Sequence, residues 1–483
     1  MEIGERYALR SILELESEDG IVGISETHGG DAIAQGFQQL REKIVGADAY
    51  LLAGNLLPMI DASASGDRSQ TYYLPGENPL DAAARLYSAI EIACLDLIGK
   101  SVAKPACDLL GGRARSEVPF SAYPFYKQAG GGGEGDDARS DEYGEALTPK
   151  QLVVQVKLMF AKYGFREIKF KAGVLDPAEE IETVRQLRAG FGPKVPIRLD
   201  PNCAWSVATS VEIGRALREE LGNGGYLEDP TANISGMAAV RKQLVSAGVD
   251  TPLASNVAVT GFADLPEAIK TDAVQVVLCD PHYWGGIQQV QHLGKLCHTF
   301  GLGLSMHSNS HLGVSLMAMA QAAAATPQLT YACDTHYPWQ SEEDEVVAGG
   351  RIPIVNGCVR IPEKPGLGVE LDQDQLARGR ERYRKCKYRK SELAKGLAQV
   401  VTKRGKGEAG AKENGRKGEP AAKENRRKGE SAQRRTGRPR PCFLLSVLRR
   451  PPRARLSIQE IASVLAVPHE NTAGAVGSPC AFS

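Results

Sequence analysis

The chain contains a series of short apolar runs, each of which ends in a polar residue. From residue 168 onward the polar ends recur at intervals of 24 to 31 residues, with amphipathic stretches such as DPAEEIETVRQLRAGF and GIQQVQHLGKLCHTFG between them. A strand, a loop, a helix and a return loop need roughly 25–35 residues. The pattern therefore predicts an α/β fold with a (β/α) TIM-like barrel, whose strands carry active-site residues at their carboxyl ends. These run ends are Lys169, Asp200, Glu228, Asn256, Asp280, His307 and His336.

A different pattern precedes the barrel. Residues 1–30 alternate apolar and polar positions around an EDG turn, which predicts strands, whereas residues 31–60 and 78–112 have helical periodicity. We therefore expect a small α+β domain before the barrel. The predicted units are an α+β domain at 1–115, the barrel at 116–345, a segment returning to the first domain at 346–377, and a tail at 378–483.

The run SEVPFSAYPFY at residues 116–126 is predicted to be the first barrel strand, ending at Tyr123 and Phe125. The next segment, residues 127–145, is rich in Gly and acidic residues and predicts a flexible loop. Because it follows a strand end, it lies on the predicted active-site face, either as a lid or as a solvated insertion.

Composition sets limits on the class of protein. The 483 residues are 42% hydrophobic, which is normal for a globular protein. No apolar run reaches the roughly 18 residues of a membrane-spanning helix, and the N-terminus has no apolar signal-peptide core. The ten cysteines form no C-x-x-C pair, which argues against a zinc site or a disulfide scaffold. We therefore expect a protein of the reducing cytoplasm.

The net charge of zero hides two different pieces. Residues 378–483 contain 27 Lys and Arg but only 9 Asp and Glu, a net of +18, so residues 1–377 carry −18. An imperfect 11-residue repeat in the tail lacks an apolar stripe, which predicts disorder. The stretch RRTGRPRP could contact nucleic acid, but a solvated appendage or a mistranslated end of the reading frame is favoured. LSIQEIASVLAV near the end predicts a short amphipathic helix.

Lys169 and Lys171, in the run IKFKA, are candidates for acid–base chemistry. Two residues apart on a strand, they project from the same face. Neighbouring ammonium groups repel and burial disfavours their charge, and either effect lowers the pKa of a lysine toward that of a usable base. A solvated face with two lysines by chance is the alternative for the pair alone; the later polar strand ends favour catalysis.

Three oxygen ligands end consecutive predicted strands. Asp200, Glu228 and Asn256 form a set without Cys or His, which suits Mg²⁺. Helix N-capping is the alternative, since Asp and Asn do this routinely, but it is weaker for three residues in register. Asp229 is an alternative ligand to Glu228, although strand alternation would turn it out of the barrel.

Asp280 and His307 end adjacent predicted strands. A carboxylate beside an imidazole fixes its tautomer and raises its basicity, so His307 is a candidate acid or base. His282 and His311 are nearby competitors, but each lies past a strand end, where lid packing or structural bonding is favoured. His28 is interpreted as structural.

Around one barrel mouth, these groups place the lysines on one side, the metal in the middle and the His–Asp pair opposite. That arrangement suits removal of a proton α to a carboxylate, with bases on both faces of the resulting enediolate and the metal stabilising its charge. A β-hydroxyl can then leave with a proton from a general acid.

Eight motifs follow one another along the chain: K-x-K, LDPNCAWS, EDP, an Asn strand end, DPHYW, MHSNSH, DTHYPW and PEKPGLGVELD. In the order of these motifs the sequence resembles the enolase superfamily, and within it the glucarate dehydratase group, over most of residues 5–377. The resemblance implies that residues 1–115 cap the barrel. It also implies a carbon–oxygen lyase (hydro-lyase) that dehydrates a hexarate such as glucarate or idarate to a 4-deoxy-5-keto acid, and assembly into a homo-oligomer.

By this resemblance, Lys171 is the base on one face and Lys169 its electrostatic partner. His307, oriented by Asp280, is the opposite base and the acid for hydroxide loss. Mg²⁺ is the implied cofactor and an acid-sugar dicarboxylate the implied substrate. The implied metal ligands are Asp200, Glu228 and Asn256; Asn202 contacts the substrate or enolate, and the pocket is lined by Tyr123, Phe125, Asn309 and His336.

The chain departs from the family at both ends. Only residues 1–5 precede RYALRSIL, where the family has an earlier strand and a lid with a substrate-contacting histidine. After GLGVELDQDQ the sequence diverges, so the arginine segment that meets the distal carboxylate is absent or replaced. The alternatives are a dehydratase for another acid sugar, or a weakly active barrel that binds partners through its basic tail.

Overall fold

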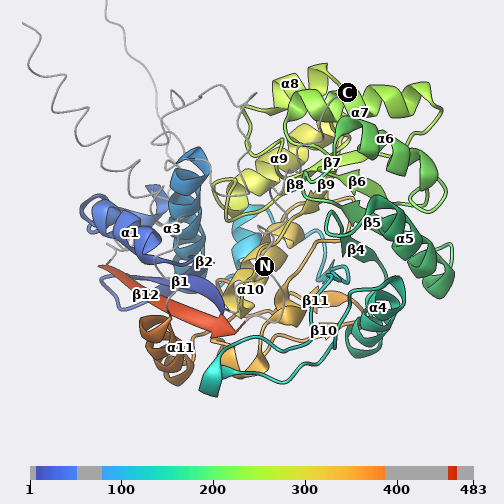
Figure 1. Cartoon of the computed structure of the whole chain (residues 1–483). Coiled ribbons are helices and arrows are strands. Elements are labelled where there is room, and N and C mark those ends of the chain that lie inside the picture. Colours follow the sequence, from blue (N-terminus) through green and yellow to red (C-terminus); the bar gives the residue numbers. More distant parts are fainter. Residues whose placement is uncertain (1–6, 52–78, 387–454, 465–483) are drawn as a thin grey trace, which may run out of the picture.

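The computed structural model describes residues 7–51, 79–386 and 455–464 (Figure 1). They form a barrel of parallel strands with a capping domain against one side. Among these residues, no helix is both long enough and apolar enough to cross a membrane. The predicted strands of residues 1–30 are present over Tyr7–Glu16 and Val22–His28, and the helices predicted for 31–60 and 78–112 are present over Asp31–Ile44 and Pro79–Ser101.

Six parallel strands form most of the barrel wall, in the order in which they occur in the chain. Their residues are almost all buried on both faces, as expected for short apolar runs covered by helices. The strands are β4 (Ile168–Lys171), β5 (Ile197–Asp200), β6 (Tyr226–Glu228), β7 (Leu253–Ser255), β8 (Val276–Cys279) and β9 (Gly303–Met306).

Helices alternate with these strands and lie outside them in Figure 1. Several begin at a side chain that caps the first turn, as at Thr148, Asp176, Ser206 and Asn233. The helices are α4 (Pro149–Tyr163), α5 (Pro177–Phe191), α6 (Val207–Ala216), α7 (Ile234–Ser246), α8 (Leu265–Lys270), α9 (Ile287–Thr299) and α10 (Gly313–Ala324).

Two irregular segments close the ring. Residues 120–125 make parallel bridges to β4 at Ala122–Ile168 and Phe125–Lys171, and Phe120 bridges Cys333. Residues 332–334 lie beside β9, because the Asp334 N–H donates a hydrogen bond of 2.8 Å to the carbonyl of Met306, the last residue of that strand. The barrel therefore closes without regular strands at its first and last positions.

The predicted first strand over 116–126 is correspondingly shorter. Only β3 (Glu117–Pro119) is regular, and it pairs in an antiparallel sheet with β11 (Cys358–Arg360), which also pairs with β10 (Ile354–Val355). Pro119 and Pro124 lack the N–H that a regular ladder needs, which explains the interruption. The predicted final run, LTYACDTH, forms a bridge rather than a strand.

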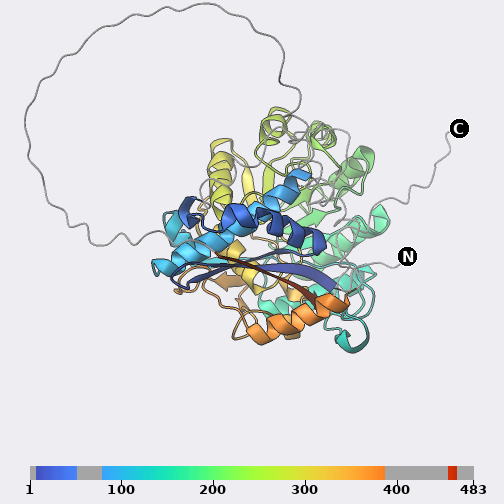
Figure 2. The same cartoon turned by 90° about the vertical axis from the view of Figure 1, so that its left-hand side faces the viewer.

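The capping domain contains a three-stranded antiparallel sheet. Strand β1 (Tyr7–Glu16) lies between β2 (Val22–His28) and β12 (Arg455–Val464). Helices α1 (Asp31–Ile44) and α3 (Pro79–Ser101) cover one face, and α11 (Gln373–Lys385) lies on the other (Figure 2).

Strand β12 is a correction to the sequence analysis, which predicted a helix for this stretch. The strand pairs with β1 over ten residues, from Tyr7–Val464 to Glu16–Arg455. A short apolar run is compatible with either structure from periodicity alone, and an open sheet edge decides for the strand. The helix α11 likewise continues past the predicted boundary at residue 378.

The rest of the tail lies outside the described residues. The predictions of disorder and of nucleic-acid contact concern that part of the chain, and the predicted domain limits also stay predictions.

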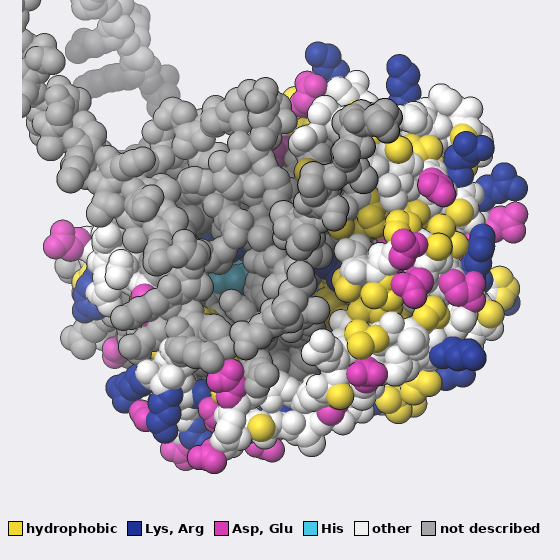
Figure 3. All heavy atoms as spheres, in the orientation of Figure 1, with side chains coloured by type: hydrophobic (Ala, Val, Ile, Leu, Met, Phe, Trp, Pro, Cys, Tyr) yellow, Lys and Arg dark blue, Asp and Glu magenta, His cyan; other side chains and the backbone are white. Residues whose placement is uncertain are grey.

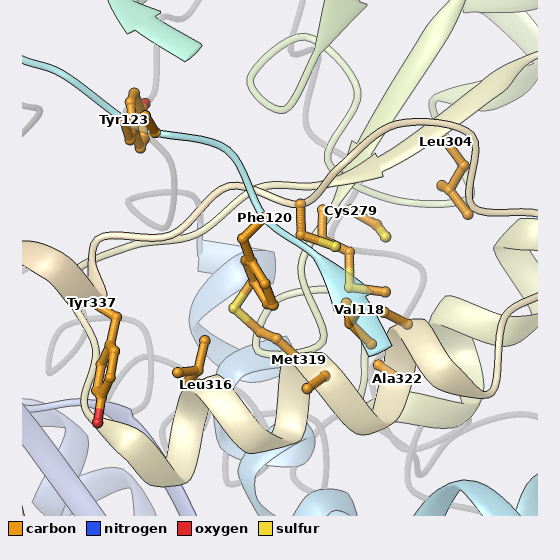
Figure 4. Close-up of a cluster of buried hydrophobic side chains, with 14 of the residues drawn as sticks. Val118, Phe120, Tyr123, Cys279, Leu304, Leu316, Met319, Ala322 and Tyr337 are labelled. Atoms are coloured by element: carbon orange, nitrogen blue, oxygen red, sulfur yellow. The ribbon is translucent and has the colours of Figure 1, made fainter. Parts of the chain in front are cut away.

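Helix α10 is buried along its whole length between the barrel and the capping domain. Leu316, Met319 and Ala322 lie on the side that faces Phe120 and Val118 (Figure 4). A helix that is apolar all round must be enclosed by protein. This helix therefore joins the cores of the two domains.

The Gly-rich loop, which the sequence predicts to be flexible, is held at several points in the structure. Asp141 accepts hydrogen bonds from Lys127 and from the backbone of Gly130 and Gly144. Asp137 pairs with Arg382 of α11 at 3.2 Å. The loop thus connects the first barrel segment to the capping domain.

Candidate active site

Lys169 and Lys171 project from β4 to the same side, as predicted, but Lys169 is enclosed by acidic groups. Its Nζ lies 2.7 Å from Glu228 Oε2, 2.7 Å from Asp334 Oδ2 and 3.3 Å from Asp200 Oδ2. Burial lowers the pKa of Lys169, but Asp334, Glu228 and Asp200 outweigh it and hold that pKa well above its usual value. The expected lowering of the pKa is therefore wrong for Lys169, because the three carboxylates favour its charged form.

Lys171 lies nearer the outside of the site. Its Nζ donates to Asp200 Oδ2 at 3.0 Å, and the hydroxyl of Tyr123 donates to the same oxygen at 3.2 Å. Lys171 keeps a small exposed fraction of 7%, whereas Lys169 has none. Of the two lysines, Lys171 is therefore the one that a substrate can reach.

Asp200 and Glu228 are the last residues of β5 and β6, and Asn256 directly follows β7. Burial and the nearby Asp200 raise the pKa of Glu228 well above its usual value, although Lys169 opposes this. The site therefore gathers more negative charge than its lysines balance easily, and this favours a bound cation.

Asp229 has a different role. Its oxygens accept from Ser255 Oγ at 2.5 Å and from the backbone N–H groups of Asn256 and Val257 at 2.8 and 3.1 Å. Burial raises the pKa of Asp229 to about 6, against these donors. Because it holds the turn after β7, Asp229 is the weaker candidate for a metal ligand, and the choice of Glu228 stays a prediction.

The Asn256 amide connects the two halves of the site. Oriented to satisfy its neighbours, its NH₂ donates to Asp229 Oδ2 at 2.7 Å and to Glu228 Oε1 at 3.2 Å, and its oxygen accepts from His307 Nε2 at 3.1 Å. Turning the amide over would direct its oxygen toward the carboxylates, which is favourable with a cation between them. Two carboxylates and an amide oxygen fit Mg²⁺ chemically. The described residues contain no cluster of three His, Cys, Asp or Glu with metal-binding geometry.

Asp280 and His307 follow β8 and β9 and face each other, with His307 Nδ1 3.6 Å from Asp280 Oδ2. A second histidine lies closer: His282 Nδ1 is 2.6 Å from Asp280 Oδ1. Burial raises the pKa of Asp280, but His282 first and then His307 outweigh it and hold the pKa well below its usual range. In the orientation of Figure 1, a histidine side chain is visible deep in the middle of the space-filled face (Figure 3).

The predicted pocket residues also come together in part. The ring centroids of Tyr123 and Phe125 lie 4.5 Å apart, and those of Tyr123 and His336 4.8 Å apart. Asn309 Nδ2 is buried with no hydrogen-bond partner among the described residues, so it is available to a ligand. Asn202, two residues after the end of β5, adopts a left-handed φ of 48° and donates its backbone N–H to the Asp200 side chain.

Sequence reasoning missed two members of the site. Asp334, the third carboxylate around Lys169, follows the irregular segment that lacks a regular strand, two residues before His336. Sequence reasoning also missed the contact between His282 and Asp280, because it paired Asp280 only with the histidine of the next strand end. The signal that could have revealed it is the motif DPH, in which the two residues are only two positions apart. The contacts otherwise run continuously from Lys171 through Asp200, Lys169, Glu228, Asn256 and His307 to Asp280.

A parallel α/β barrel whose strand ends gather lysines, oxygen ligands and a His–Asp pair is typical of a class of enzymes, and comparison with known proteins agrees. The family model described as enolase C-terminal domain-like matches residues 151–375. A probable glucarate dehydratase from Streptomyces coelicolor is 42% identical over 382 residues, which cover 78% of this chain and 85% of that protein.

Solved structures give the same result. An enolase from Pseudomonas fluorescens Pf0-1 with bound magnesium, potassium and tartrate has a TM-score of 0.73 and 40% identity, covering 83% of this chain and 94% of its own. An enolase from Mycobacterium smegmatis complexed with tartrate has a TM-score of 0.72 and 43% identity, covering 83% and 91%. The chain belongs to the enolase superfamily.

Proposed function

We propose that the protein is a Mg²⁺-dependent hydro-lyase that dehydrates an acid sugar, with a glucarate- or idarate-like hexarate as substrate. One observation carries this function: Asp200, Glu228 and Asn256 lie between Lys171 and His307, and the Asn256 amide is next to both Glu228 and His307 whichever way it is turned. The similarity to a probable glucarate dehydratase and the tartrate in related structures support a hydroxylated dicarboxylate.

The proposed chemistry assigns each residue a task. Asp200, Glu228 and Asn256 would hold Mg²⁺, which would supply positive charge to stabilise the enediolate. Lys169 stays charged and balances the surrounding carboxylates. Either neutral Lys171 or neutral His307 takes the α-proton, depending on the epimer, because the two bases lie on opposite faces of the planar enediolate.

Loss of the β-hydroxyl completes the reaction. Protonated His307, held by Asp280, donates a proton as the carbon–oxygen bond breaks, and water leaves. The resulting enol takes up a proton at the former β-carbon and releases its hydroxyl proton, which gives the keto acid, so atoms and charge balance. Tyr123, Phe125, Asn309 and His336 line the space for the substrate.

The test is a screen of purified protein with Mg²⁺ against hexarates and aldonates, with a carbonyl-trapping reagent to detect the keto acid. We expect turnover of glucarate or idarate. His307→Asn should lose turnover of both epimers, because His307 supplies the acid for hydroxide loss, and Lys171→Ala should lose turnover of the epimer whose proton Lys171 takes. Turnover of only a different acid sugar would keep the proposed chemistry and change the proposed substrate. A folded protein that turns over none of them would contradict the proposal. That the protein assembles into a homo-oligomer stays a prediction, and the same purified protein can be used to test it.

A further inference from the structure

The Asp280 carboxylate is shared between two histidines in different ways. Its Oδ1 accepts from both the backbone N–H of His282, at 2.8 Å, and the ring Nδ1 of His282, at 2.6 Å. Its Oδ2 faces His307 Nδ1 at 3.6 Å. Because two donors from His282 fix one oxygen, the other oxygen is left directed at the proposed catalytic imidazole.

The His282 ring is itself fixed from behind. Its Nε2 lies 2.6 Å from Ser315 Oγ, and both side chains are buried. Ser315 belongs to the first turn of α10, a helix that begins at Leu312 without a side-chain cap of its own. The orientation of the His282 ring therefore depends on where this helix begins.

The capping domain supplies the missing cap. Glu26 of β2 accepts from the N–H of Leu312 at 2.8 Å and from the N–H of Ser315 at 2.9 Å. Arg10 of β1 pairs with Glu26 at 2.8 Å, and all of these groups are buried. A continuous set of buried contacts thus leads from the capping sheet to Asp280.

We propose that His282 is a positioning residue for the acid–base function of His307, acting through Asp280, and that Ser315 and Glu26 fix His282 in turn. The inference rests on the proposed function. The contrast with Asp229 supports it: backbone N–H groups and Ser255 satisfy that buried carboxylate, whereas Asp280 is held by an imidazole that the capping domain orients. The sequence analysis had assigned His282 to lid packing or structural bonding.

The experiment separates the two bases. In D₂O with Mg²⁺, exchange of the α-proton is followed by ¹H NMR for two C5-epimeric hexarates, glucarate and idarate. Wild type, Lys171→Ala and His307→Asn first establish which epimer depends on which base. His282→Leu, which removes the ring donor, is then expected to slow the His307-dependent exchange by about 10–100-fold, the usual effect of losing such a supporting hydrogen bond. The Lys171-dependent exchange should change much less.

Two further variants provide controls. His282→Asn keeps an N–H donor close to the position of Nδ1 and should restore most of the His307-dependent rate. His311 is equally buried but bonds to Thr335 instead of Asp280, so His311→Gln should affect both exchange rates in the same proportion. Equal slowing of both exchange reactions in His282→Leu would show that His282 is merely structural and would overturn the proposal.

A second readout needs no substrate. In full-length protein labelled with ¹⁵N-histidine, the His307 ring N–H resonance should be visible in wild type and His282→Asn and lost in His282→Leu. An unchanged resonance in His282→Leu would contradict positioning whatever the activity. If wild type exchanges neither epimer while the resonance behaves as expected, the proposed substrate class is wrong and the positioning role stands.

Discussion

Charge at the barrel mouth is balanced residue by residue. The buried ammonium group of Lys169 contacts three carboxylates, and it also lies 4.7 Å from the centre of the Tyr123 ring. A cation–π contact and several ion pairs all favour the charged form. Lys169 and a bound Mg²⁺ would therefore share the task of neutralising Asp200 and Glu228.

Replacing Lys169 by Met should destabilise the protein most when Mg²⁺ is absent. Removing one partner of a buried charge cluster typically costs about 3–5 kcal/mol, because the remaining charges lose their compensation. Adding Mg²⁺ should recover part of this loss, so the thermal midpoint of the variant should rise more with Mg²⁺ than that of wild type. The measurement is thermal unfolding with Mg²⁺ and with a chelator.

Lys162→Met is the matched control. Lys162 pairs with Glu142 and Glu342 near the surface, and such exposed pairs contribute only about 0–1 kcal/mol. Its midpoint should stay near that of wild type and respond to Mg²⁺ equally. A Lys169→Met variant with the same response to Mg²⁺ as wild type would show that the metal is not bound at these carboxylates.

Glu228 and Asp229 offer a second test at the residue scale. Saturating Mg²⁺ at about 100 times its dissociation constant should stabilise wild type by about 2.7 kcal/mol. Glu228→Gln should lose this stabilisation, because a proposed ligand is removed. Asp229→Asn should lower stability at all Mg²⁺ concentrations through the turn after β7 while retaining the metal effect. Urea unfolding at a series of Mg²⁺ concentrations measures the stability of both variants. If Asp229→Asn loses the stabilisation by Mg²⁺ and Glu228→Gln retains it, Asp229 is the ligand.

At the scale of elements, carboxylates of the capping domain hold the first turns of two barrel helices. Glu26 caps α10, and Glu91 of α3 accepts from the N–H groups of Ile287 and Gln288 at the start of α9, at 2.9 and 3.0 Å. A Cβ added at Gly286 would lie 2.1 Å from Glu91 Oε2, so glycine leaves the room that this carboxylate occupies. Helix N-termini that lack local caps thus join the two domains.

Glu91 gives stability a dependence on pH. Burial raises its pKa to about 8, although its two backbone donors oppose the shift. Between the unfolded pKa of about 4.3 and the folded value, the folded protein holds a proton that the unfolded chain releases, so the free energy of unfolding falls as pH rises. Wild type should therefore lose roughly 1 kcal/mol per pH unit relative to Glu91→Gln across this window.

Urea unfolding of both proteins at pH 5.5 and 8.5 checks this, since other groups cancel in the difference. The same substitution at the exposed Glu182, which bonds to Gln186, should leave the pH dependence unchanged. Equal pH dependence of wild type and Glu91→Gln would show that Glu91 is ionised in the folded protein.

Elements also show where the sequence was informative. The strand period placed Asp200, Glu228 and His307 at the carboxyl ends of strands, because a buried parallel strand is a short apolar run and the first polar residue after it marks its end. It could not show that Lys169 faces three carboxylates, because Asp334 arrives from a segment without regular structure. Nor could it show the strand β12, whose conformation depends on the open edge of β1.

At the scale of the whole molecule, residues near the two ends of the described chain lie side by side. β12 is hydrogen-bonded to β1, and Arg10 of β1 pairs with Glu26, which caps the helix behind His282. The sheet that β12 completes is therefore the same sheet that reaches the proposed active site. Without β12, β1 would present an unpaired edge of ten residues.

Removal of residues 387–483 should consequently lower the thermal midpoint by several degrees and promote concentration-dependent association, because an open strand edge pairs readily with other chains. Removal of 465–483 alone, which retains β12, should do neither. A synthetic peptide covering residues 455–464, added to the longer truncation, should restore the midpoint and suppress association. Thermal unfolding and light scattering measure the two effects. If both truncations behave like wild type, β12 contributes nothing to stability, and the capping sheet needs only β1 and β2 to hold Glu26 in place.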